Sequence, residues 1–535
     1  MADESDVLIV GAGVAGALIA WRLARAGIRV TVVEAGPEVD RGAAVGRFKQ
    51  APIRVPEAPY RMRPYAEYPT TIDDTYIRQD GPEPFRSTYL RQVGGTTWHW
   101  LGTALRLLPH DLELRRRYGV GVDWPLNYAD LAPWYDAAEA ELGVAGHADP
   151  LGSPRQNPYP MPELPLTLGD RLMDEAAVPL GYRVRVSPQA RNSQPFDDRP
   201  ACCASASCIP ICPVQAKYDA TVHVRKAVAA GARILSNSVA VRIDVTGDGM
   251  VGGVAIRRPD RSETSLSARH IVIAAHAIEG PKLLLMSRDE RYPNGVANSS
   301  GAVGRYLMDH PVQLTRALAP TPVWPRRGPQ EVSAIHDMRD GDHRRQHGAF
   351  LMNVGNQGWE WAGPNLAGLA RRYVEAGLSG TALLDAVRSH SSQEMTLVAL
   401  TEQLPDPDNR VTPDFQRLDA IGVPKPRVFF RLDYYTIAAL AAARRIHERL
   451  FRGLGATEIG HTPHAEGAGH IMGTTRMGAD RKTSVANADG RSHDHPNLWF
   501  AGSSLFPTCG TANPTLTIAA LALRTAEAIK VAAGR

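Results

Sequence analysis

Four of the chain's five cysteines lie within eleven residues, at Cys202, Cys203, Cys208 and Cys212, with Pro213 directly after the last. Only alanine and serine separate the second cysteine from the third, so the thiolates can converge from one short loop. Thiolates are soft ligands that select zinc, copper(I) or iron–sulfur clusters. The spacing therefore predicts a metal centre held by Cys202, Cys208 and Cys212.

The composition of this loop favours an iron–sulfur cluster over zinc. Zinc sites usually draw on a second CxxC-like hook or on histidine partners, and no second hook is present. A four-iron cluster takes four cysteines, but Cys203 is adjacent to Cys202 and is sterically poor as a co-ligand. Three usable thiolates fit a three-iron, four-sulfur (3Fe–4S) cluster. Zinc, and cysteines that are free or disulfide-bonded, remain the alternatives, and the distant Cys509 is expected to be a small core residue.

A second chemical signal stands at the start of the chain. Residues 7–10 are apolar and mostly β-branched, so they are predicted to form a buried strand. Gly11 permits a tight turn, Gly13 lets the backbone approach a pyrophosphate, and Gly16 lets the next helix pack close to the strand. The helix expected at residues 14–26 points its N-terminal amides at the phosphates.

An acidic residue completes this dinucleotide signature. Gly27 is expected to end the helix, and residues 30–33 are predicted to form the second strand. Glu34 follows about twenty residues after the glycines, where a carboxylate accepts hydrogen bonds from ribose hydroxyls. The glycine pattern alone is weak, but strand, glycines, helix, strand and acid in this order strongly indicate a bound dinucleotide.

Composition excludes several classes of protein. The 535 residues carry a formal net charge of only +4, with no long basic block, so nucleic-acid binding is not expected. No apolar run reaches the roughly eighteen residues that a membrane-spanning helix needs. The acidic residues 1–6 are unlike a secretory signal peptide. An odd number of cysteines, clustered at one place, argues against a disulfide framework.

The pattern along the chain predicts a discontinuous architecture. Residues 37–90, rich in proline and arginine, are expected to be long surface loops, and residues 311–460 to mix strands with proline-rich turns. Helices are predicted at 128–142, 221–230 and 515–533, and strands at 232–235, 240–245 and 269–275. We therefore expect one nucleotide-binding domain made of residues 1–110, 201–310 and 465–535. Residues 111–200 and 311–464 are expected to form a substrate-binding domain.

With these motifs in place, the chain resembles the glucose–methanol–choline (GMC) oxidoreductase superfamily nearly from end to end. It is most similar to the catalytic subunits of bacterial FAD-dependent sugar dehydrogenases, the branch that includes glucose, fructose and glucoside 3-dehydrogenases. The resemblance is carried by residues 93–100, by the spaced cysteines with 209–213, by 298–300 with 307–311, and by the tail segments 494–498 and 513–517.

This resemblance implies a fold, cofactors and an activity. The expected fold is α/β plus α+β, a Rossmann-like FAD-binding domain with an antiparallel-sheet substrate domain. The implied cofactors are FAD and a 3Fe–4S cluster. The implied activity is oxidation of a sugar or glycoside hydroxyl by hydride transfer to flavin N5, with electrons leaving through the cluster to an acceptor other than NAD.

Two residues match the superfamily's catalytic positions, His470 and Asn513. The resemblance implies that the histidine removes the proton of the substrate hydroxyl and that the asparagine fixes that hydroxyl by hydrogen bonding. An imidazole titrates near neutral pH and suits a general base. Ala468-Gly469 precede the histidine, where the similar sugar dehydrogenases carry two asparagines, so glucose specificity is not carried over.

The resemblance also implies contacts to the FAD. The implied residues are Gly94, Gly95, Thr97, Trp98, Val241, Gly502 and Asn513, beside Gly11, Gly13, Gly16 and Glu34. His99 is expected to pack or hydrogen-bond near the flavin, with covalent attachment as the alternative. Asp309-His310-Pro311 is expected to have a structural role where the domains meet.

Two other functions stay open, namely a sugar or glycoside oxidase that uses oxygen and a non-catalytic electron-transfer subunit. The related enzymes work outside the cytoplasmic membrane, where a small companion subunit carries the export signal. The resemblance therefore implies such a companion, a cytochrome c acceptor, and a periplasmic or membrane-associated location reached through the partner. A cytoplasmic flavoprotein is the alternative.

Overall fold

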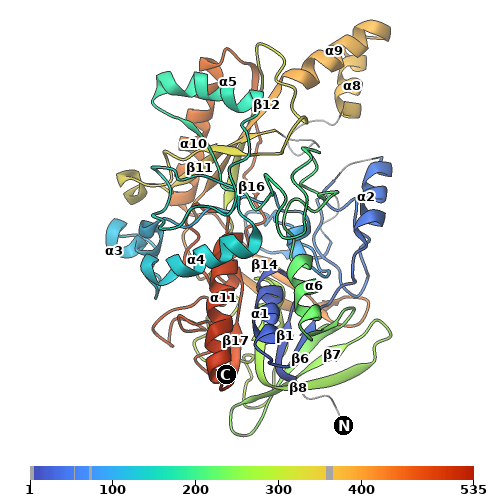
Figure 1. Ribbon diagram of the computed structural model, residues 1–535, viewed down its shortest axis with the longest axis vertical. Coiled ribbons are helices and arrows are strands. Elements are labelled where there is room, and N and C mark those ends of the chain that lie inside the picture. The colour runs from blue at the N-terminus through green and yellow to red at the C-terminus, as the bar shows by residue number, and fades with distance from the viewer. Residues whose placement is uncertain (1–4, 53–54, 72–74, 357–365) are drawn as a thin grey trace.

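The computed structural model describes residues 5–52, 55–71, 75–356 and 366–535. Residues 1–4, part of the acidic start used to argue against a signal peptide, lie outside the described residues. Two large sheets organise the chain, one near each end of its long axis (Figure 1). Within the described residues, no helix is both long enough and apolar enough to cross a bilayer.

The first sheet carries the nucleotide signature. Its strands are β1 (Ser5–Val10), β2 (Val30–Val33), β5 (Arg233–Leu235), β6 (Val239–Val245), β7 (Val251–Arg257), β8 (Glu263–Ile273) and β17 (Leu498–Phe500). The order is β5-β2-β1-β8-β7-β6, with β17 also paired to β8. β5, β2, β1, β8 and β17 pair in parallel, whereas β6 and β7 form an antiparallel extension on the first half of β8. All four residues of β2 are buried, as expected for a strand covered on both faces.

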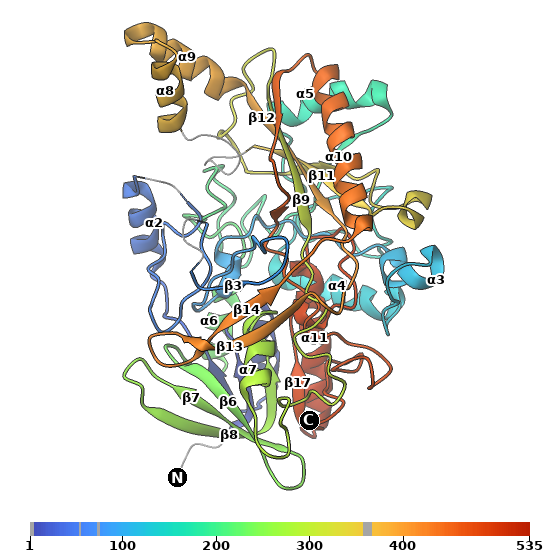
Figure 2. The same cartoon turned by 180° about the vertical axis from the view of Figure 1, so that it is seen from behind.

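Helices cover this sheet. They are α1 (Val14–Arg25), α4 (Tyr128–Leu142), α6 (Thr221–Ala229), α7 (Glu279–Met286) and α11 (Thr515–Ala532). α1 packs between α6 and α11, and α11 packs in turn on α4. Figure 1 shows α1, α6 and α11 side by side, and Figure 2 shows α7 on the opposite side of the molecule.

The second sheet is antiparallel. Its strands are β4 (Val184–Val186), β9 (Pro311–Leu318), β10 (Ser333–Ile335), β11 (Phe350–Gly355), β12 (Glu394–Thr401), β15 (Thr457–His461) and β16 (Glu466–Gly467). The order is β15-β9-β12-β11-β10-β4, and β16 also pairs with β9. α10 (Tyr434–Gly453) and α5 (Leu168–Ala177) pack on one face, where Met352, Leu397 and Ala399 meet Ala439 and Ala443. The other face is left for the cavity described below.

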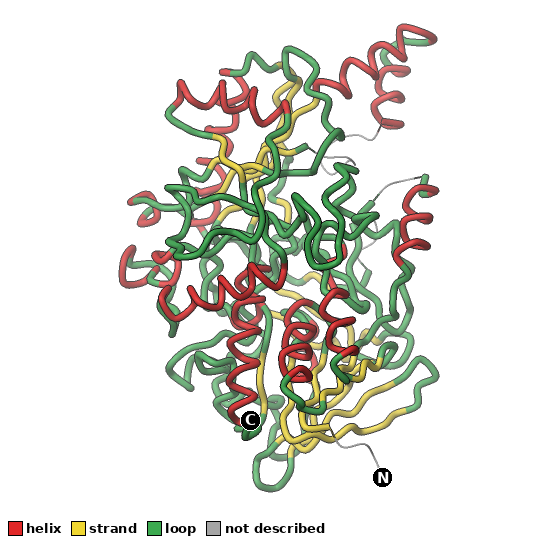
Figure 3. Tube along the Cα trace, in the orientation of Figure 1, coloured by secondary structure: helices red, strands yellow, loops and turns green. Residues whose placement is uncertain are grey.

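Smaller elements complete the molecule. β3 (Arg78–Gln79), β13 (Arg410–Leu418) and β14 (Pro424–Phe429) form a three-stranded sheet. The remaining α-helices are α2 (Arg41–Gln50), α3 (Leu114–Tyr118), α8 (Leu366–Glu375) and α9 (Gly380–Gln393). In the described part of the chain the 3₁₀ helices are η1 (Gly95–Trp98), η2 (Pro109–Leu112), η3 (Val178–Leu180), η4 (Asp342–Arg345) and η5 (Ser503–Leu505). Figure 3 shows that loops dominate the middle of the molecule, between the two sheets.

The predicted fold class is confirmed, since a largely parallel α/β sheet is combined with an antiparallel sheet. The predicted helices at 128–142, 221–230 and 515–533 and the strand beginning at residue 240 are confirmed to within a residue or two. The strands of the first sheet come from the start, middle and end of the chain. The domain boundaries themselves remain a prediction.

Two expectations were wrong. Residues 37–90 are not all loop, because α2 forms at 41–50, where the Asp40 side chain caps the helix by accepting from the Ala43 amide. Residues 311–460 contain α10, a twenty-residue helix. The Asp433 side chain caps this helix in the same way, by accepting from the Thr436 amide. The sequence carries signals for both helices, namely the two aspartate caps and, in α10, buried residues spaced three or four apart, and the prediction missed them.

Candidate functional site

A cavity of about 810 Å³ opens where the parallel strands of the first sheet end. Gly11, at the end of β1, has φ of +107°, which lets the chain turn into α1. A Cβ on Gly16 would lie 1.9 Å from the carbonyl oxygen of Gly11, so only glycine lets α1 pack this close. A Cβ on Gly13 would meet nothing within 4 Å and would project into free space at the helix N-terminus. That free space is the cradle a pyrophosphate requires.

Glu34 lies at the end of β2 and lines the same cavity. Its two carboxylate oxygens accept from the Ala12 amide at 2.9 Å and from the Gly36 amide at 3.0 Å. Burial raises the pKa of this carboxyl, and the two amides oppose that rise. Each carboxylate oxygen has a second lone pair, so Glu34 can still accept from ribose hydroxyls.

The glycine-rich segment 94–98 crosses over the cradle. Gly95 and Thr97 line the cavity, and a Cβ on Gly95 would lie 3.2 Å from the Cα of Gly13. Trp98 is buried behind the segment, where its indole nitrogen donates to the Val93 carbonyl. Trp98 and Gly94 are not among the lining residues.

Of the other residues expected to contact or approach FAD, some line the cavity and one does not. Gly502 lines the cavity beside Ser503. On β6 the wall is formed by Val239 and Ala240, whereas Val241 is not among the lining residues and packs beside Ile421. His99 is buried and lines the cavity, and burial lowers its pKa to about 3. The ring of His99 is therefore neutral.

His470 and Asn513 come together at the cavity wall, although 43 residues separate them in the sequence. Nε2 of His470 lies 3.4 Å from Nδ2 of Asn513. Oδ1 of Asn513 is buried, and no donor from the described residues reaches it. Desolvation, reinforced by the neighbouring His310, lowers the pKa of His470 well below its usual range. His470 is therefore an uncharged base at neutral pH.

The hydrogen bonds of His310 fix which nitrogen of His470 is free. Nε2 of His310 lies 3.0 Å from the Gly510 carbonyl oxygen, which can only accept, so this nitrogen carries the proton. Burial lowers the pKa of His310 to about 4, so its other nitrogen, Nδ1, keeps a lone pair. Nδ1 of His310 lies 2.8 Å from Nδ1 of His470 and must accept from it. The lone pair of His470 is thus on Nε2, facing Asn513.

Asp309 fixes the backbone of both histidines by accepting hydrogen bonds from their amides. Its Oδ1 accepts from the backbone amides of His310 at 2.7 Å and of His470 at 2.8 Å. Its Oδ2 accepts from the hydroxyl of Ser87. The expected structural role of residues 309–311 is therefore only part of their contribution, since they also position the base.

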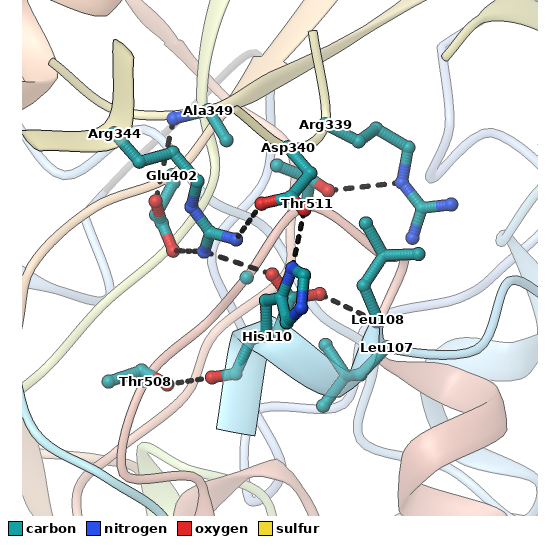
Figure 4. Close-up of polar contacts among 12 residues, drawn as sticks. Leu107, Leu108, His110, Arg339, Asp340, Arg344, Ala349, Glu402, Thr508 and Thr511 are labelled. Atoms are coloured by element: carbon teal, nitrogen blue, oxygen red, sulfur yellow. Dashed lines mark hydrogen bonds and ion pairs between the residues drawn. The ribbon is translucent and has the colours of Figure 1, made fainter. Parts of the chain in front are cut away.

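The loop that carries Asn513 is anchored by buried charges (Figure 4). The Arg344 guanidinium pairs with Asp111 at 2.9 Å and with Glu402 at 2.6 Å, and all three side chains are fully buried. Nε of Arg339 donates to the Thr511 hydroxyl at 3.1 Å. The Thr508 hydroxyl donates to the backbone carbonyl of Asp111 at 3.4 Å, so the 508–513 loop also contacts this triad, whose Glu402 directly follows β12.

Three of the four thiols in the cysteine loop are at least partly buried. Cys208 and Cys212 are buried and Cys202 is half-buried, and burial raises the pKa of the Cys202 thiol, with a smaller contribution from charge on Cys208 and Cys212. Cys203 is exposed. Among the described residues, no three histidine, cysteine or acidic side chains converge closely enough to hold one metal ion. Cluster ligands each bind a different iron, so they need not converge on one point as ligands of a single zinc ion must.

Donors and positive charges surround these thiols. The Ala204 amide donates to Sγ of Cys202, the Lys217 amide to Sγ of Cys212, and Nη1 of Arg191 to Sγ of Cys208, at 3.4 to 3.5 Å. Within the described part of the chain, neither Arg191 nor Lys217 forms an ion pair with a carboxylate, although both are buried. Buried, unpaired cations favour an anionic partner, which thiolates or a thiolate-held cluster would supply.

Sequence reasoning missed three contributors to the site. His310 and Asp309 were assigned only a structural role, although an acid beside a histidine in a matched segment was a usable signal. Lys217 was not singled out. Its ammonium donates to the carbonyls of Thr97 and Trp98, which ties the cysteine loop to the segment over the cradle. No local pattern marks such a long-range contact.

Comparison with known proteins extends this description. Residues 6–329 match the family model described as FAD dependent oxidoreductase. Residues 405–522 match the model described as GMC oxidoreductase. The first match covers more than half of the chain and contains the cradle. The second contains His470 and Asn513.

Individual relatives align over nearly the whole chain. The fructose dehydrogenase large subunit of Gluconobacter japonicus is 37% identical, with 98% of each chain covered. The 2-methyl-1,2-propanediol dehydrogenase of Mycolicibacterium austroafricanum is 29% identical over 99% of this chain and 95% of its own. The crystal structure of pyridoxine 4-oxidase from Mesorbium loti has a TM-score of 0.64 at 19% identity, covering 98% and 99%, which shows the shared fold.

The cradle at Gly13 predicts a selective loss of cofactor. Gly13→Ala places a methyl group where the pyrophosphate must lie, without a clash inside the protein. We expect the variant to fold and to bind FAD at least about tenfold more weakly, because close approach to the helix N-terminus is lost. The bound-flavin absorbance and the circular dichroism spectrum check this. Gly46→Ala, in α2 and also free of neighbours, should keep its FAD.

The His470 geometry predicts a catalytic loss without loss of FAD. His470→Ala should slow flavin reduction by the substrate about a hundredfold or more, as expected for removal of a general base. Anaerobic stopped-flow absorbance measures this rate. His147→Ala, at an exposed histidine, is the control and should reduce its flavin at the normal rate. A normal rate in His470→Ala would mean that the base lies elsewhere.

Proposed function

The chain belongs to the GMC family of FAD-dependent oxidoreductases, and from that premise we propose that it is a dehydrogenase that oxidises a hydroxyl of a sugar or sugar derivative. The observation that carries this proposal is the pairing of His470 Nε2 with Asn513 Nδ2 on the wall of a cavity shared with the dinucleotide cradle. The fructose dehydrogenase large subunit, by its name, supports a sugar as the substrate.

The chain's own residues can carry the proton chemistry. A hydroxyl placed between His470 and Asn513 would donate its proton to Nε2 of the histidine and accept from Nδ2 of the asparagine. His310 keeps Nε2 available, because it accepts the other ring proton of His470. Bound FAD, held by Gly13 and Glu34, supplies the acceptor for the hydride that leaves the carbon. Loss of the hydroxyl proton to His470 makes that departure easier.

We further propose that Cys202, Cys208 and Cys212 hold a 3Fe–4S cluster. Three thiols that are at least partly buried, backbone amides on two of the sulfurs and buried cations nearby fit an anionic cluster. Such a cluster would supply one-electron transfer to an external acceptor. Its neighbour Lys217 links this loop to the segment over the cradle.

The acceptor and location are also part of the proposal. The relative at 37% identity is named as a large subunit, which supports a companion subunit for this chain. We propose a small companion subunit, a cytochrome c as electron acceptor, and a periplasmic or membrane-associated location reached through these partners.

A substrate panel tests the proposed activity. Purified protein is mixed anaerobically with D-fructose, D-glucose, D-gluconate and methyl glucoside, and the flavin absorbance is followed. At least one of these should bleach the flavin, and an artificial dye should restore it. If oxygen restores it at the rate of turnover, the protein is an oxidase. If none of these four compounds bleaches it, the proposed substrate class is wrong.

Variants of the cysteines test the cluster. Cys208→Ser should abolish the iron content and the iron signal in electron paramagnetic resonance, because three thiolates are the minimum set. Sugar should still bleach its flavin, whereas reduction of cytochrome c should fall at least about tenfold. Cys203→Ser changes an exposed thiol and should leave all three readouts unchanged. Loss of iron in Cys203→Ser but not in Cys202→Ser would overturn the ligand assignment.

A further inference from the structure

One face of the second sheet forms a wall of the cavity. Cross-strand pairing places Leu314, Val398 and Asn353 in one row across β9, β12 and β11. The next inward-facing row contributes Val312 and Leu400, and all five residues line the cavity. The wall is thus largely apolar, with the amide of Asn353 at the β11 end of the first row.

The side chain of Asn353 is buried, but its amide oxygen has no hydrogen-bond donor among the described residues. Its side chain is only 2% exposed, and no described residue donates to Oδ1. A buried amide oxygen without a donor is costly, and natural proteins rarely leave one unless a ligand or water completes it. A valine or leucine in this row, like its neighbours, would have avoided that cost. The amide is therefore suited to a polar ligand inside the cavity.

Glu331 lines the same cavity and carries a buried carboxyl group. The residue lies just before β10 and is 5% exposed. None of the described residues donates a hydrogen bond to its carboxylate. Burial raises the pKa of this carboxyl to about 7, and the charge of Arg191 opposes that rise. A buried carboxylate needs donors, and hydroxyl groups of a ligand can supply them.

Arg191 does not satisfy this carboxylate by hydrogen bonding. Its Nη2 donates to the backbone oxygen of Glu331 at 2.7 Å and to Oε1 of Gln189 at 2.8 Å, and its Nη1 donates to Cys208. These bonds hold the backbone of Glu331 and leave the carboxylate free. The side chain of the adjacent Gln330 is also fixed, because its Oε1 accepts from the Ile209 amide at 2.9 Å.

The backbone of Glu331 is strained. Its φ is +37°, a left-handed conformation that non-glycine residues rarely adopt. Such outliers gather at ligand sites, where the surrounding structure enforces them. Glu331 stands three residues before Ala334, which pairs directly with Asn353. Three residues span about 10 Å along a strand, so the two side chains can contact one sugar-sized molecule.

We propose that Glu331 and Asn353 form a hydroxyl-binding subsite for the part of the substrate that is not oxidised. The substrate is then a polyhydroxylated molecule of sugar size rather than a monohydric alcohol. This inference rests on the proposed function, because His470 and Asn513 act on the hydroxyl that is oxidised. It also accounts for a pocket in which Ala468 and Gly469 offer no polar side chain.

Kinetics on matched substrates test the subsite. The wild type and the variants Glu331→Gln and Asn353→Leu are assayed with D-fructose, D-sorbitol, myo-inositol, cyclohexanol and propan-2-ol, using an artificial dye. For the best polyol, each variant should lose about 10- to 100-fold in kcat/KM, mostly through a higher KM. The preference for that polyol over the best monohydric alcohol should fall by a similar factor. Glu375→Gln, at an exposed glutamate, should change neither quantity.

The outcomes separate the two proposals. A wild type that no compound reduces would overturn the proposed function. A wild type reduced by cyclohexanol or propan-2-ol but by no polyol would overturn both the subsite and the proposed sugar substrate, and would leave only alcohol oxidation. An unchanged preference in either variant, with full FAD content, would overturn the subsite alone. If Glu331→Gln fails to bind FAD, Asn353→Leu and the conservative Asn353→Asp decide the question, since rescue by aspartate is expected only for a group that contacts hydroxyls.

Discussion

The hydrogen bonds of Asp309 and His310 are the constraint on which the site depends. These residues directly precede β9 of the second sheet, yet they bind the backbone and ring of His470 and the carbonyl of Gly510. One short stretch therefore sets the orientation of the base and supports the loop that carries Asn513. Because each of these groups is buried, an unmade bond would cost more than the bond itself contributes. The orientation of His470 and the position of the loop that carries Asn513 are therefore fixed together.

Buried charged side chains next to the site also help to fix its geometry. Arg344 with Asp111 and Glu402 forms a fully buried triad (Figure 4). Such a triad adds little net stability compared with apolar packing, but removing one partner leaves an uncompensated charge. The triad thus fixes Asp111, whose backbone carbonyl accepts from the Thr508 hydroxyl of the 508–513 loop. A base and an orienting amide need such fixed positions, because small displacements of reacting groups cost large factors in rate.

The two halves of the cavity use different parts of the chain to recognise their ligands. The cradle is made largely of backbone, with glycines that a side chain would obstruct, so it suits the invariant pyrophosphate of a dinucleotide. The sheet wall is made of side chains on fixed strands, and single polar groups in an apolar surface can select a substrate there. The first half is shared by the FAD-dependent oxidoreductases that the chain matches, whereas the second can differ between relatives.

The sequence by itself determined the nucleotide-binding unit, because strand, glycines, helix and Glu34 are contiguous and each has a local physical reason. It also indicated the cysteine loop and, through resemblance, His470 and Asn513. Only the tertiary structure decided which tautomer His470 has, since that depends on His310 and Gly510, 160 residues before it and 40 after it. The same holds for Glu331 and Asn353, which become neighbours of one cavity through strand pairing. Long-range pairing leaves no periodicity in the chain, so these contacts could not be predicted from the sequence.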